Sequence, residues 1–269
     1  MSGDLAGQKA LVTGASVGIG RAIAQTLTDR GAAVAIGDLN LDGAREAARS
    51  LGKSSLAMEL DVGKNKSVTA AFGAIVQRWG RLDILVNNAG VVTATPGREG
   101  FAPDRDIDWT AVWNVNLRGT VRCSAAAVKL MKKQRHGKIV NIASMAGHAA
   151  RGTGGAYAVS KAAVLRYTKG LAMEVAPFNV NVNAVCPGAV WTPLQERAAT
   201  RRRQVEPERF AQEKELYDVF TETFSPITPL ARPQTPEDVA NAVAFLPSEQ
   251  SRNITAQCLH VDGGVILRD

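Results

Sequence analysis

Short apolar runs rich in valine, isoleucine and leucine alternate with longer amphipathic segments along the chain. The short runs predict strands buried on both faces, and the amphipathic segments predict helices between them. Such alternation is typical of βαβ units with right-handed connections. The predicted strands are Lys9–Thr13, Ala33–Gly37, Ser55–Leu60, Leu82–Val86, Lys138–Ile142, Asn181–Val185 and Gln257–Val261. The sequence therefore predicts an α/β fold, in which residues 1–269 form one domain around a doubly wound, seven-stranded parallel sheet with helices on both faces.

The pattern changes between Pro193 and Pro233, where charged residues dominate. A helix is predicted at Glu208–Thr223, between the flanking prolines. Long connections at the edge of an α/β sheet often carry function. We therefore expect residues of about 193–233 to form a mobile helical lid over the substrate.

Composition is that of a soluble globular protein, with 45% apolar and 21% charged residues. The formal net charge of +7 and the pI near 9.5 raise the question of an acidic partner. Part of the excess is local, in the run Arg201–Arg203 and in the group Lys132, Lys133 and Arg135. Aromatic residues, which a nucleic-acid surface would interleave with these cations, are missing from both runs. Solvated surface is the favoured interpretation, and no nucleic-acid partner is expected.

The N-terminal residues lack the basic-then-apolar pattern of a secretion signal, and no apolar stretch approaches the ~20 residues that span a bilayer. A cytoplasmic protein without membrane association is expected. Cys123, Cys186 and Cys258 are widely spaced and odd in number, so neither a disulfide framework nor a zinc site is predicted. Buried reduced thiols are expected, and no metal is expected.

A glycine-rich loop follows the first strand directly. Its sequence is Gly14-Ala15-Ser16-Val17-Gly18-Ile19-Gly20, and a helix is expected from about Arg21. In this position the backbone can approach a pyrophosphate, whose charge the helix N-terminus stabilises. The spacing Gly-x-x-x-Gly-x-Gly differs from the commoner Gly-x-Gly-x-x-Gly, so the loop alone leaves a plain tight turn as the alternative.

Asp38, at the end of the second predicted strand, favours the cofactor interpretation. A carboxylate at this distance from the loop can accept hydrogen bonds from the adenosine ribose hydroxyls, which predicts NAD. A 2′-phosphate would bring roughly two further negative charges toward it. Val17 and Leu39 occupy the places where a compensating cation is expected. The alternative role for Asp38 is to cap the next helix.

Tyr157 and Lys161 lie four residues apart at the start of an amphipathic helix, which places the phenol and the ammonium on one face. Lowering a tyrosine pKa from about 10 toward 7 requires about 4 kcal/mol. A unit charge ~4 Å away at an effective dielectric constant of 20 supplies about that much. Lys161, helped by a positive nicotinamide ring, is thus expected to make Tyr157 a usable general base.

Ser144 follows the fifth predicted strand, at the carboxyl edge where α/β sheets bind ligands. Its hydroxyl can orient and polarise a reacting oxygen. A Ser-His-Asp hydrolase is the rival interpretation. The chain contains His136, His148 and His260, but no Gly-x-Ser-x-Gly elbow surrounds Ser144.

Taken together, these motifs resemble those of the short-chain dehydrogenase/reductase family over nearly the whole chain. Besides the glycine loop, Ser144, Tyr157 and Lys161, the matching segments are Asp61-Val62, Asn87-Asn88-Ala89-Gly90, Asn116 within Asn-Val-Asn-Leu-Arg-Gly, Pro187-Gly188 through Thr192, and Val261–Gly264. The resemblance implies a Rossmann-type fold and NAD-dependent oxidation of a secondary alcohol to a ketone, with a polyol, diol or small hydroxy compound as substrate.

Carried over residue by residue, the resemblance implies catalytic roles for Asn116, Ser144, Tyr157 and Lys161. Asn116 would continue a proton relay from Lys161, with Asn114 as the alternative. The implied cofactor residues are Gly14, Ser16, Val17, Gly18, Ile19, Gly20, Asp38, Leu39, Asp61, Val62, Asn88, Ala89, Gly90, Tyr157, Lys161, Pro187, Gly188, Val190 and Thr192. A homotetramer or homodimer is the implied assembly.

Residues expected to face a small-molecule substrate are His148 and Arg151 after Ser144, and Trp191 and Leu194 after the Pro-Gly turn. Arg151 could pair with an anionic substrate group. Two other functions stay open. One is an NADPH-dependent keto reductase of the ketoacyl type, against which Asp38 argues. The other is a non-catalytic dinucleotide-binding regulator, for which the basic pI is the only support.

Overall fold

The computed structural model describes residues 3–52, 54–92, 106–148 and 155–267. Its seven strands form one parallel sheet in the order β3-β2-β1-β4-β5-β6-β7. The strands are β1 Lys9–Thr13, β2 Ala33–Asp38, β3 Leu56–Glu59, β4 Ile84–Asn87, β5 Gly137–Ile142, β6 Val180–Pro187 and β7 Cys258–Val261. The predicted doubly wound α/β fold is confirmed, and each predicted strand coincides with an observed one to within about two residues at each end.

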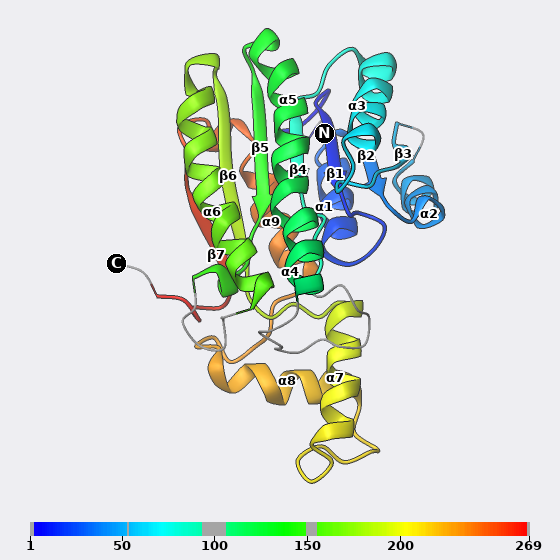
Figure 1. The fold of residues 1–269 in the computed structure, drawn as a ribbon, viewed down its shortest axis with the longest axis vertical. Helices are drawn as coiled ribbons and strands as arrows, with labels where there is room; N and C mark the ends of the chain where they lie inside the picture. The colour runs from blue at the N-terminus through cyan, green and yellow to red at the C-terminus, as the bar shows by residue number, and fades with distance from the viewer. Residues whose placement is uncertain (1–2, 53, 93–105, 149–154, 268–269) are drawn as a thin grey trace.

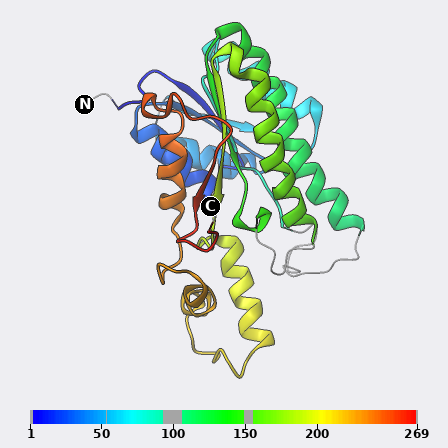
Figure 2. The same cartoon turned by 90° about the vertical axis from the view of Figure 1, so that its left-hand side faces the viewer.

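Helices cover both faces of the sheet (Figure 1). The bounds are α1 Gly18–Asp29, α2 Leu41–Leu51, α3 Asn65–Trp79, α4 Asp106–Trp113, α5 Thr120–Gln134, α6 Ala156–Val175, α7 Pro193–Val205, α8 Leu216–Phe224 and α9 Pro236–Phe245. Figure 2 shows α1 and α9 on one side of the sheet and α5 and α6 on the other. Within the described residues, none of these helices is long and apolar enough to cross a bilayer.

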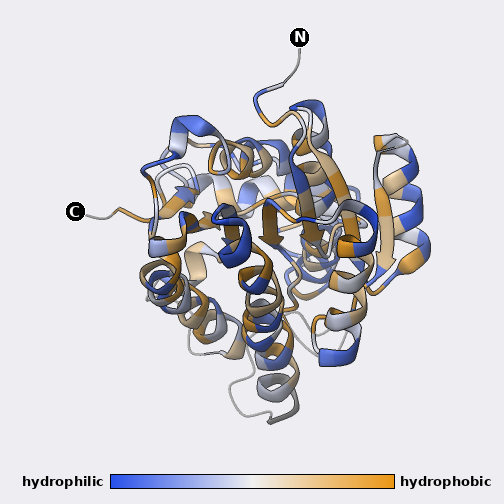
Figure 3. Cartoon of the chain, turned by 90° about the horizontal axis from the view of Figure 1, so that it is seen from above, coloured by the Kyte–Doolittle hydropathy of each residue, from blue (hydrophilic) through white to orange (hydrophobic). Residues whose placement is uncertain are grey.

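Two core clusters lie on opposite faces of the sheet. One joins α1, α2 and α9 to β1 and β2 through side chains such as Ile23, Leu27 and Val243. The other joins α3 and α5 to the opposite face through side chains such as Ile75 and Met131. Strands buried from both sides are apolar on both faces, which accounts for the uninterrupted apolar runs in the sequence. The central strands are correspondingly hydrophobic in colour, while the helices around them are mixed (Figure 3).

The order of the strands reverses at β1, which pairs with β2 on one side and with β4 on the other. Connections leave such a pair in opposite directions, so a crevice opens outside the carboxyl ends of the two strands. The glycine loop after β1 and the residues that follow β4 both lie there. The order of the strands therefore brings the glycine loop and the residues after β4 together in this crevice.

The segment predicted as a lid contains two helices, α7 and α8, which project beyond the carboxyl ends of the strands (Figures 1 and 2). The predicted helix Glu208–Thr223 is wrong in its first half, because residues 206–215 form turns between the two helices, whereas its second half lies in α8. Those turns place Phe210, which is fully buried, in a cluster with Val219 and Phe220. The burial of this apolar cluster determines the path of a segment that is otherwise highly charged.

The arginine run Arg201–Arg203 belongs to this segment. The Arg202 guanidinium lies 5.0 Å from the centre of the Phe224 ring, and Arg203 Nη1 donates hydrogen bonds to the carbonyls of Gln212 and Lys214, at 3.1 and 2.9 Å. These contacts tie α7 to the turns and to α8. Arg202 and Arg203 thus connect the parts of this segment to one another rather than serving only as solvated charge.

Candidate active site

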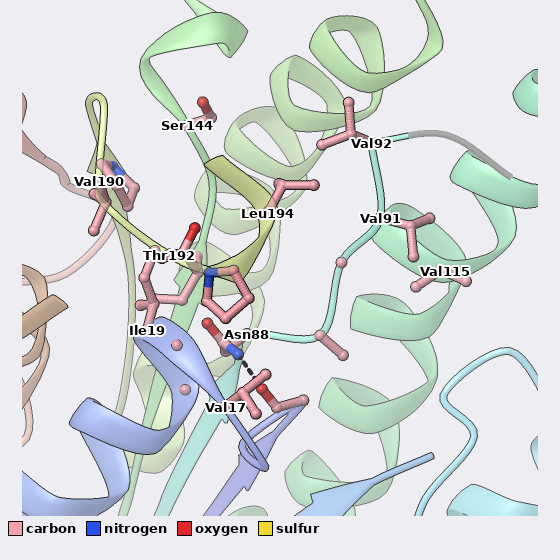
Figure 4. A pocket seen from close by; sticks show the side chains of 18 of the residues that line it. Val17, Ile19, Asn88, Val91, Val92, Val115, Ser144, Val190, Thr192 and Leu194 are labelled. Atoms are coloured by element: carbon pink, nitrogen blue, oxygen red, sulfur yellow. Dashed lines mark hydrogen bonds between the residues drawn. The ribbon is translucent and has the colours of Figure 1, made fainter. Parts of the chain in front are cut away.

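A cavity of about 490 Å³ opens at the carboxyl edge of the sheet. Figure 4 shows its wall, with Val17 and Ile19 from the glycine loop, Asn88 after β4, and Ser144 after β5. Each of the residues predicted to bind the cofactor lines this cavity: Gly14, Ser16, Val17, Gly18, Ile19, Gly20, Asp38, Leu39, Asp61, Val62, Asn88, Ala89, Gly90, Tyr157, Lys161, Pro187, Gly188, Val190 and Thr192. The fold thus brings to one place residues that span most of the chain.

The glycine loop needs its glycines for two steric reasons. Gly14 has φ +63°, and a Cβ atom there would lie 2.7 Å from the Cα of Ala89. At Gly20 a Cβ atom would lie 2.3 Å from the carbonyl oxygen of Gly14. Helix α1 then begins at Gly18, and Val17 before it provides no side-chain cap. The first N–H groups of α1 are therefore available to an anionic ligand.

Thr13 and Asn88 tie the glycine loop to the end of β4. The Thr13 hydroxyl accepts hydrogen bonds from the amides of Asn88 and Ala89, at 3.1 and 3.0 Å. The Asn88 side-chain amide donates to the carbonyls of Thr13 and Gly14, at 3.0 and 2.8 Å. Asn88 thus acts on the shape of the loop, and its amide is occupied by the protein's own backbone.

Asp38 ends β2 inside the cavity. Its Oδ2 atom accepts a hydrogen bond from the Ser16 amide at 3.0 Å, and its Oδ1 atom accepts one from the Asn40 amide at 2.9 Å. The cap of α2 is Asn40, whose side chain accepts from the Gly43 amide. The capping role considered for Asp38 is therefore filled by another residue. A carboxylate oxygen accepts more than one hydrogen bond, so both oxygens retain capacity for ribose hydroxyls.

Apolar side chains surround this carboxylate. Val17 is 56% exposed and Leu39 is 68% exposed, and both line the cavity. Among the described residues, the basic side chains of the lining are Lys161 from α6 and Arg197 from α7. Neither cation belongs to the turn between β2 and α2 that carries Asp38. The charge at this end of the cavity is therefore negative.

Helix α6 places Tyr157 and Lys161 one turn apart on the same face. The Lys161 Nζ atom donates a hydrogen bond to the Ile142 carbonyl at 2.8 Å, and it lies 5.7 Å from the centre of the Tyr157 ring. Ser144 follows β5 and is buried, and its Oγ atom accepts from the Ala146 amide at 3.1 Å. All three side chains line the same cavity. They can therefore act on one ligand.

Burial dominates the protonation of this group. It raises the pKa of the Tyr157 phenol above its usual value, while the Ser144 side chain acts in the opposite direction. It lowers the pKa of Lys161 to about 8. This differs from the expectation that Lys161 lowers the pKa of Tyr157, because loss of solvent destabilises the phenolate and the ammonium alike. In the protein alone, the phenol is held in its neutral, proton-donating form.

Asn116 lies in a π-helical turn, Asn114–Gly119, between α4 and α5. It is buried, and its side-chain amide donates to the Val91 carbonyl and to Ser160 Oγ, at 2.9 and 3.0 Å. Ser160 Oγ in turn donates to the Tyr157 carbonyl at 2.6 Å. Asn114, the alternative considered for this role, instead contacts Gly63 and Arg122. Asn116 does not line the cavity but buttresses the loop and the helix that do.

Two predicted substrate residues lie elsewhere than expected. The Trp191 indole packs against Tyr217 and Phe220 of the lid, with ring centres 5.4 and 5.1 Å away. The His148 ring lies 4.9 Å from that of His260. Neither Trp191 nor His148 is part of the described cavity lining, because each side chain packs against a neighbouring ring instead. Arg151 lies outside the described residues.

Several lining residues were not predicted. They are Leu60, Val91, Val92, Val115, Ile142, Ala143, Pro193, Gln195 and Arg197. Most are apolar, and in the sequence they cannot be told from core residues. Pro193 is the exception, because a proline at the first position of a helix is a recognised start signal and would have predicted α7. Leu194, which the sequence placed near the substrate, does line the cavity (Figure 4).

Comparison with known proteins shows the family to which the chain belongs. A family model described as Enoyl-(Acyl carrier protein) reductase matches residues 14–266. The chain is 35% identical over 267 residues to the 3-oxoacyl-(acyl-carrier-protein) reductase of Thermotoga maritima, covering 98% of this chain and 99% of the relative. It is 34% identical over 262 residues to the enzyme of that name from Escherichia coli, covering 97% and 98%.

A solved structure also matches along the whole chain. The 3-ketoacyl-(acyl-carrier-protein) reductase from Brucella melitensis, complexed with NADH, has a TM-score of 0.82 and 32% identity, covering 98% of this chain and 100% of that one. A short-chain type dehydrogenase/reductase from Mycobacterium marinum has a TM-score of 0.83 and 30% identity, covering 98% of each chain. The protein therefore belongs to the short-chain dehydrogenase/reductase family of oxidoreductases.

Proposed function

We propose that this protein is an NAD(H)-dependent reductase that converts the ketone of a 3-oxoacyl substrate to a secondary alcohol. The observation that carries the proposal is the convergence of Ser144, Tyr157 and Lys161 on a cavity that also contains the glycine loop and Asp38. Reduction of a ketone by a nicotinamide cofactor requires a proton donor beside a dinucleotide site. Tyr157 can be that donor, and the glycine loop and Asp38 suit a dinucleotide.

In this mechanism Ser144 and Tyr157 hold the carbonyl oxygen. As hydride reaches the carbonyl carbon, Tyr157 transfers its phenolic proton to the oxygen, and the Lys161 ammonium stabilises the resulting phenolate. A nicotinamide cofactor, when bound beside these residues, would supply the hydride and a positive ring charge. Asn116 and Ser160 hold the start of α6 in place, and Asn116 would continue a proton relay from Lys161. The reverse reaction, oxidation of an alcohol, uses the same residues.

The cavity lining fits a dinucleotide. Gly14 and Gly20 leave the space that a pyrophosphate needs, and α1 presents free N–H groups to it. Asp38 would accept hydrogen bonds from the ribose hydroxyls and would repel a 2′-phosphate. This supports NAD(H) over NADP(H), and the Brucella melitensis relative was solved with NADH.

The substrate class rests on the apolar lining and on the relatives. Val91, Val92 and Leu194 line the cavity together with Ser144 (Figure 4). Side chains of this kind leave the hydroxyl groups of a polyol without hydrogen-bond partners, whereas they suit an acyl chain. The 3-oxoacyl reductases among the relatives favour the same substrate. The polyol oxidation expected from the sequence has no specific support from them.

A non-catalytic dinucleotide-binding role is less favoured, because Tyr157 and Lys161 are both present and both face the cavity. A small-molecule substrate, a cytoplasmic location and a homotetramer or homodimer remain part of the proposal.

Steady-state kinetics test the proposal. We expect oxidation of NADH by acetoacetyl-CoA, with a lower kcat/KM for NADPH and for the reverse oxidation of polyols. A clear preference for NADPH would overturn the cofactor assignment. Faster turnover of polyols with NAD than of the thioester with NADH would overturn the substrate assignment.

A further inference from the structure

Three side chains able to bind a metal ion meet on the α6 side of the sheet. His148 follows the short helical turn Met145–Gly147, Cys186 lies near the end of β6, and His260 lies on β7. The potential ligand atoms of the three residues all lie within 4.8 Å of one another. Cys186 and His260 are register partners across the two strands. The sheet therefore fixes two of the three donors relative to each other.

His260 is oriented by a carboxylate behind it. Its Nδ1 atom lies 3.2 Å from Asp262 Oδ2, and the Asp262 carboxylate also accepts from the amides of Gly264 and Ile266. The other ring nitrogen, Nε2, is buried without a hydrogen-bond partner among the described residues. Metal-binding histidines commonly donate their second N–H to a carboxylate in this way. With Nδ1 beside Asp262, Nε2 is the His260 nitrogen left to coordinate an ion.

We propose that His148, Cys186 and His260 form a zinc-binding site, with Cys186 bound as the thiolate. Two imidazoles and one thiolate suit Zn²⁺, which binds them at about 2.0–2.1 and 2.3 Å and accepts water as a fourth ligand. Tetrahedral ligands at those lengths lie roughly 3.5 Å apart, so closure requires movements of about an ångström. Binding releases the Cys186 proton to solvent. Sequence patterns did not predict this site, because its ligands come from three distant segments.

A surface pocket lies next to the proposed zinc site, and a bound ion there would connect three strands. A second surface pocket, lined by residues that include Arg232, Asp238 and Asp262, opens beside His260, which is one of the three ligands. His148 follows Ser144 by four residues, and Cys186 directly precedes Pro187 and Gly188 of the cofactor cavity. A bound ion would therefore cross-link the ends of β5, β6 and β7 beside the active site. Ligand binding to the folded state raises its stability.

Cobalt binding to the intact, tag-free and reduced protein tests the proposal. Co²⁺ replaces Zn²⁺ in such sites, and thiolate coordination gives a near-ultraviolet charge-transfer band with visible bands of a tetrahedral ion. We expect one Co²⁺ per chain, displaced by Zn²⁺, and an increased Tm in Zn²⁺. The variants Cys186→Ala and His260→Ala should show neither the charge-transfer band with Co²⁺ nor the increase of Tm in Zn²⁺. Cys123→Ala is the matched control, because Cys123 is an equally buried thiol that lies in a different core cluster from Cys186.

Three outcomes would overturn the proposal: no charge-transfer band at saturating Co²⁺, an unchanged band in Cys186→Ala, or loss of the band in both cysteine variants. Should Cys186→Ala fail to fold, Asp262→Asn provides the second test. It leaves the three ligands in place and removes the charge that orients His260. We expect it to weaken Co²⁺ binding by about 10–100-fold. Unchanged affinity in that variant would count against the site.

Discussion

The Lys161 ammonium lies 5.7 Å from the centre of the Tyr157 ring and is fixed there by a hydrogen bond to the Ile142 carbonyl. A neutral backbone group from the end of β5 thus positions the charge beside the phenol. Burial lowers the pKa of Lys161 to about 8 and raises that of Tyr157. Tyr157 is therefore protonated and can act as a proton donor. A positively charged nicotinamide ring nearby would be needed to favour the phenolate form of Tyr157.

Tyr157→Phe should abolish most of the turnover and leave the cofactor site intact. The change removes the phenolic proton but keeps the ring that packs at the start of α6. General acid-base catalysis typically contributes 10²–10⁴-fold, so we expect kcat to fall by about that factor. NADH affinity, measured by fluorescence titration, should change little. Retention of wild-type kcat would place the chemistry at another residue.

Lys161 should make stability depend on pH. Its pKa is about 8 in the folded protein against 10.5 as the ordinary value, so between these values the unfolded chain binds more protons. Stability therefore rises with pH across that window. Between about pH 7.5 and pH 9.5, the free energy of unfolding of the wild type should gain about 2 kcal/mol relative to Lys161→Met. Urea denaturation of both proteins measures this difference, and parallel pH profiles would refute it.

Asp38→Ser should weaken the preference for NADH over NADPH. A hydrogen bond to a charged group contributes about 1.5–3 kcal/mol, and the carboxylate also repels a 2′-phosphate. We expect the ratio of kcat/KM values for the two cofactors to fall at least about tenfold. Asp38 also accepts a hydrogen bond from the Ser16 amide, so the substitution can change kcat/KM for both cofactors. The ratio of the two kcat/KM values is therefore the quantity to measure. A ratio equal to that of the wild type would assign specificity to other residues.

Much of the fold follows from local sequence signals. The strand Lys9–Thr13 has the same bounds in the structure as in the prediction, because its fully buried apolar centre, Ala10–Val12, has a polar residue on each side that marks its ends. The residues from the glycine loop and Asp38 that line the cavity were equally accessible to prediction, since the glycine spacing and Asp38 are local features. The resemblance to a known family supplied the rest of that set.

Features created by long-range packing were not predictable. The lid follows the burial of Phe210 and Phe220, and no local pattern in a segment so rich in charge marks those two phenylalanines as neighbours. The raised pKa of Tyr157 depends on burial that only the fold reveals. Likewise, Cys186 and His260 come together only because β6 pairs with β7.

Gly14→Ala should destabilise the protein and impair dinucleotide binding. The residue has φ +63°, and the added methyl would lie 2.7 Å from the Ala89 backbone. We expect a loss of about 1–3 kcal/mol and an increase in the KM for NADH. Gly73→Ala is the control, because this exposed glycine in α3 has open space around it and should gain about 0.5–1 kcal/mol. Equal effects of the two substitutions on Tm would contradict the steric argument.

Phe220→Ala should loosen the lid selectively. Phe220 is fully buried and contacts the rings of Trp191 and Phe224, so truncation costs about 3–5 kcal/mol within the lid cluster. Opening of the lid exposes the run Arg201–Arg203, and trypsin should cleave there faster than in the wild type. The KM of the ketone should rise, because Leu194 and Arg197 of α7 line the cavity. Phe72→Ala, in the core cluster beneath α3, should instead lower Tm without selective cleavage of the lid. If both variants show the same cleavage pattern, the lid does not open as a separate unit.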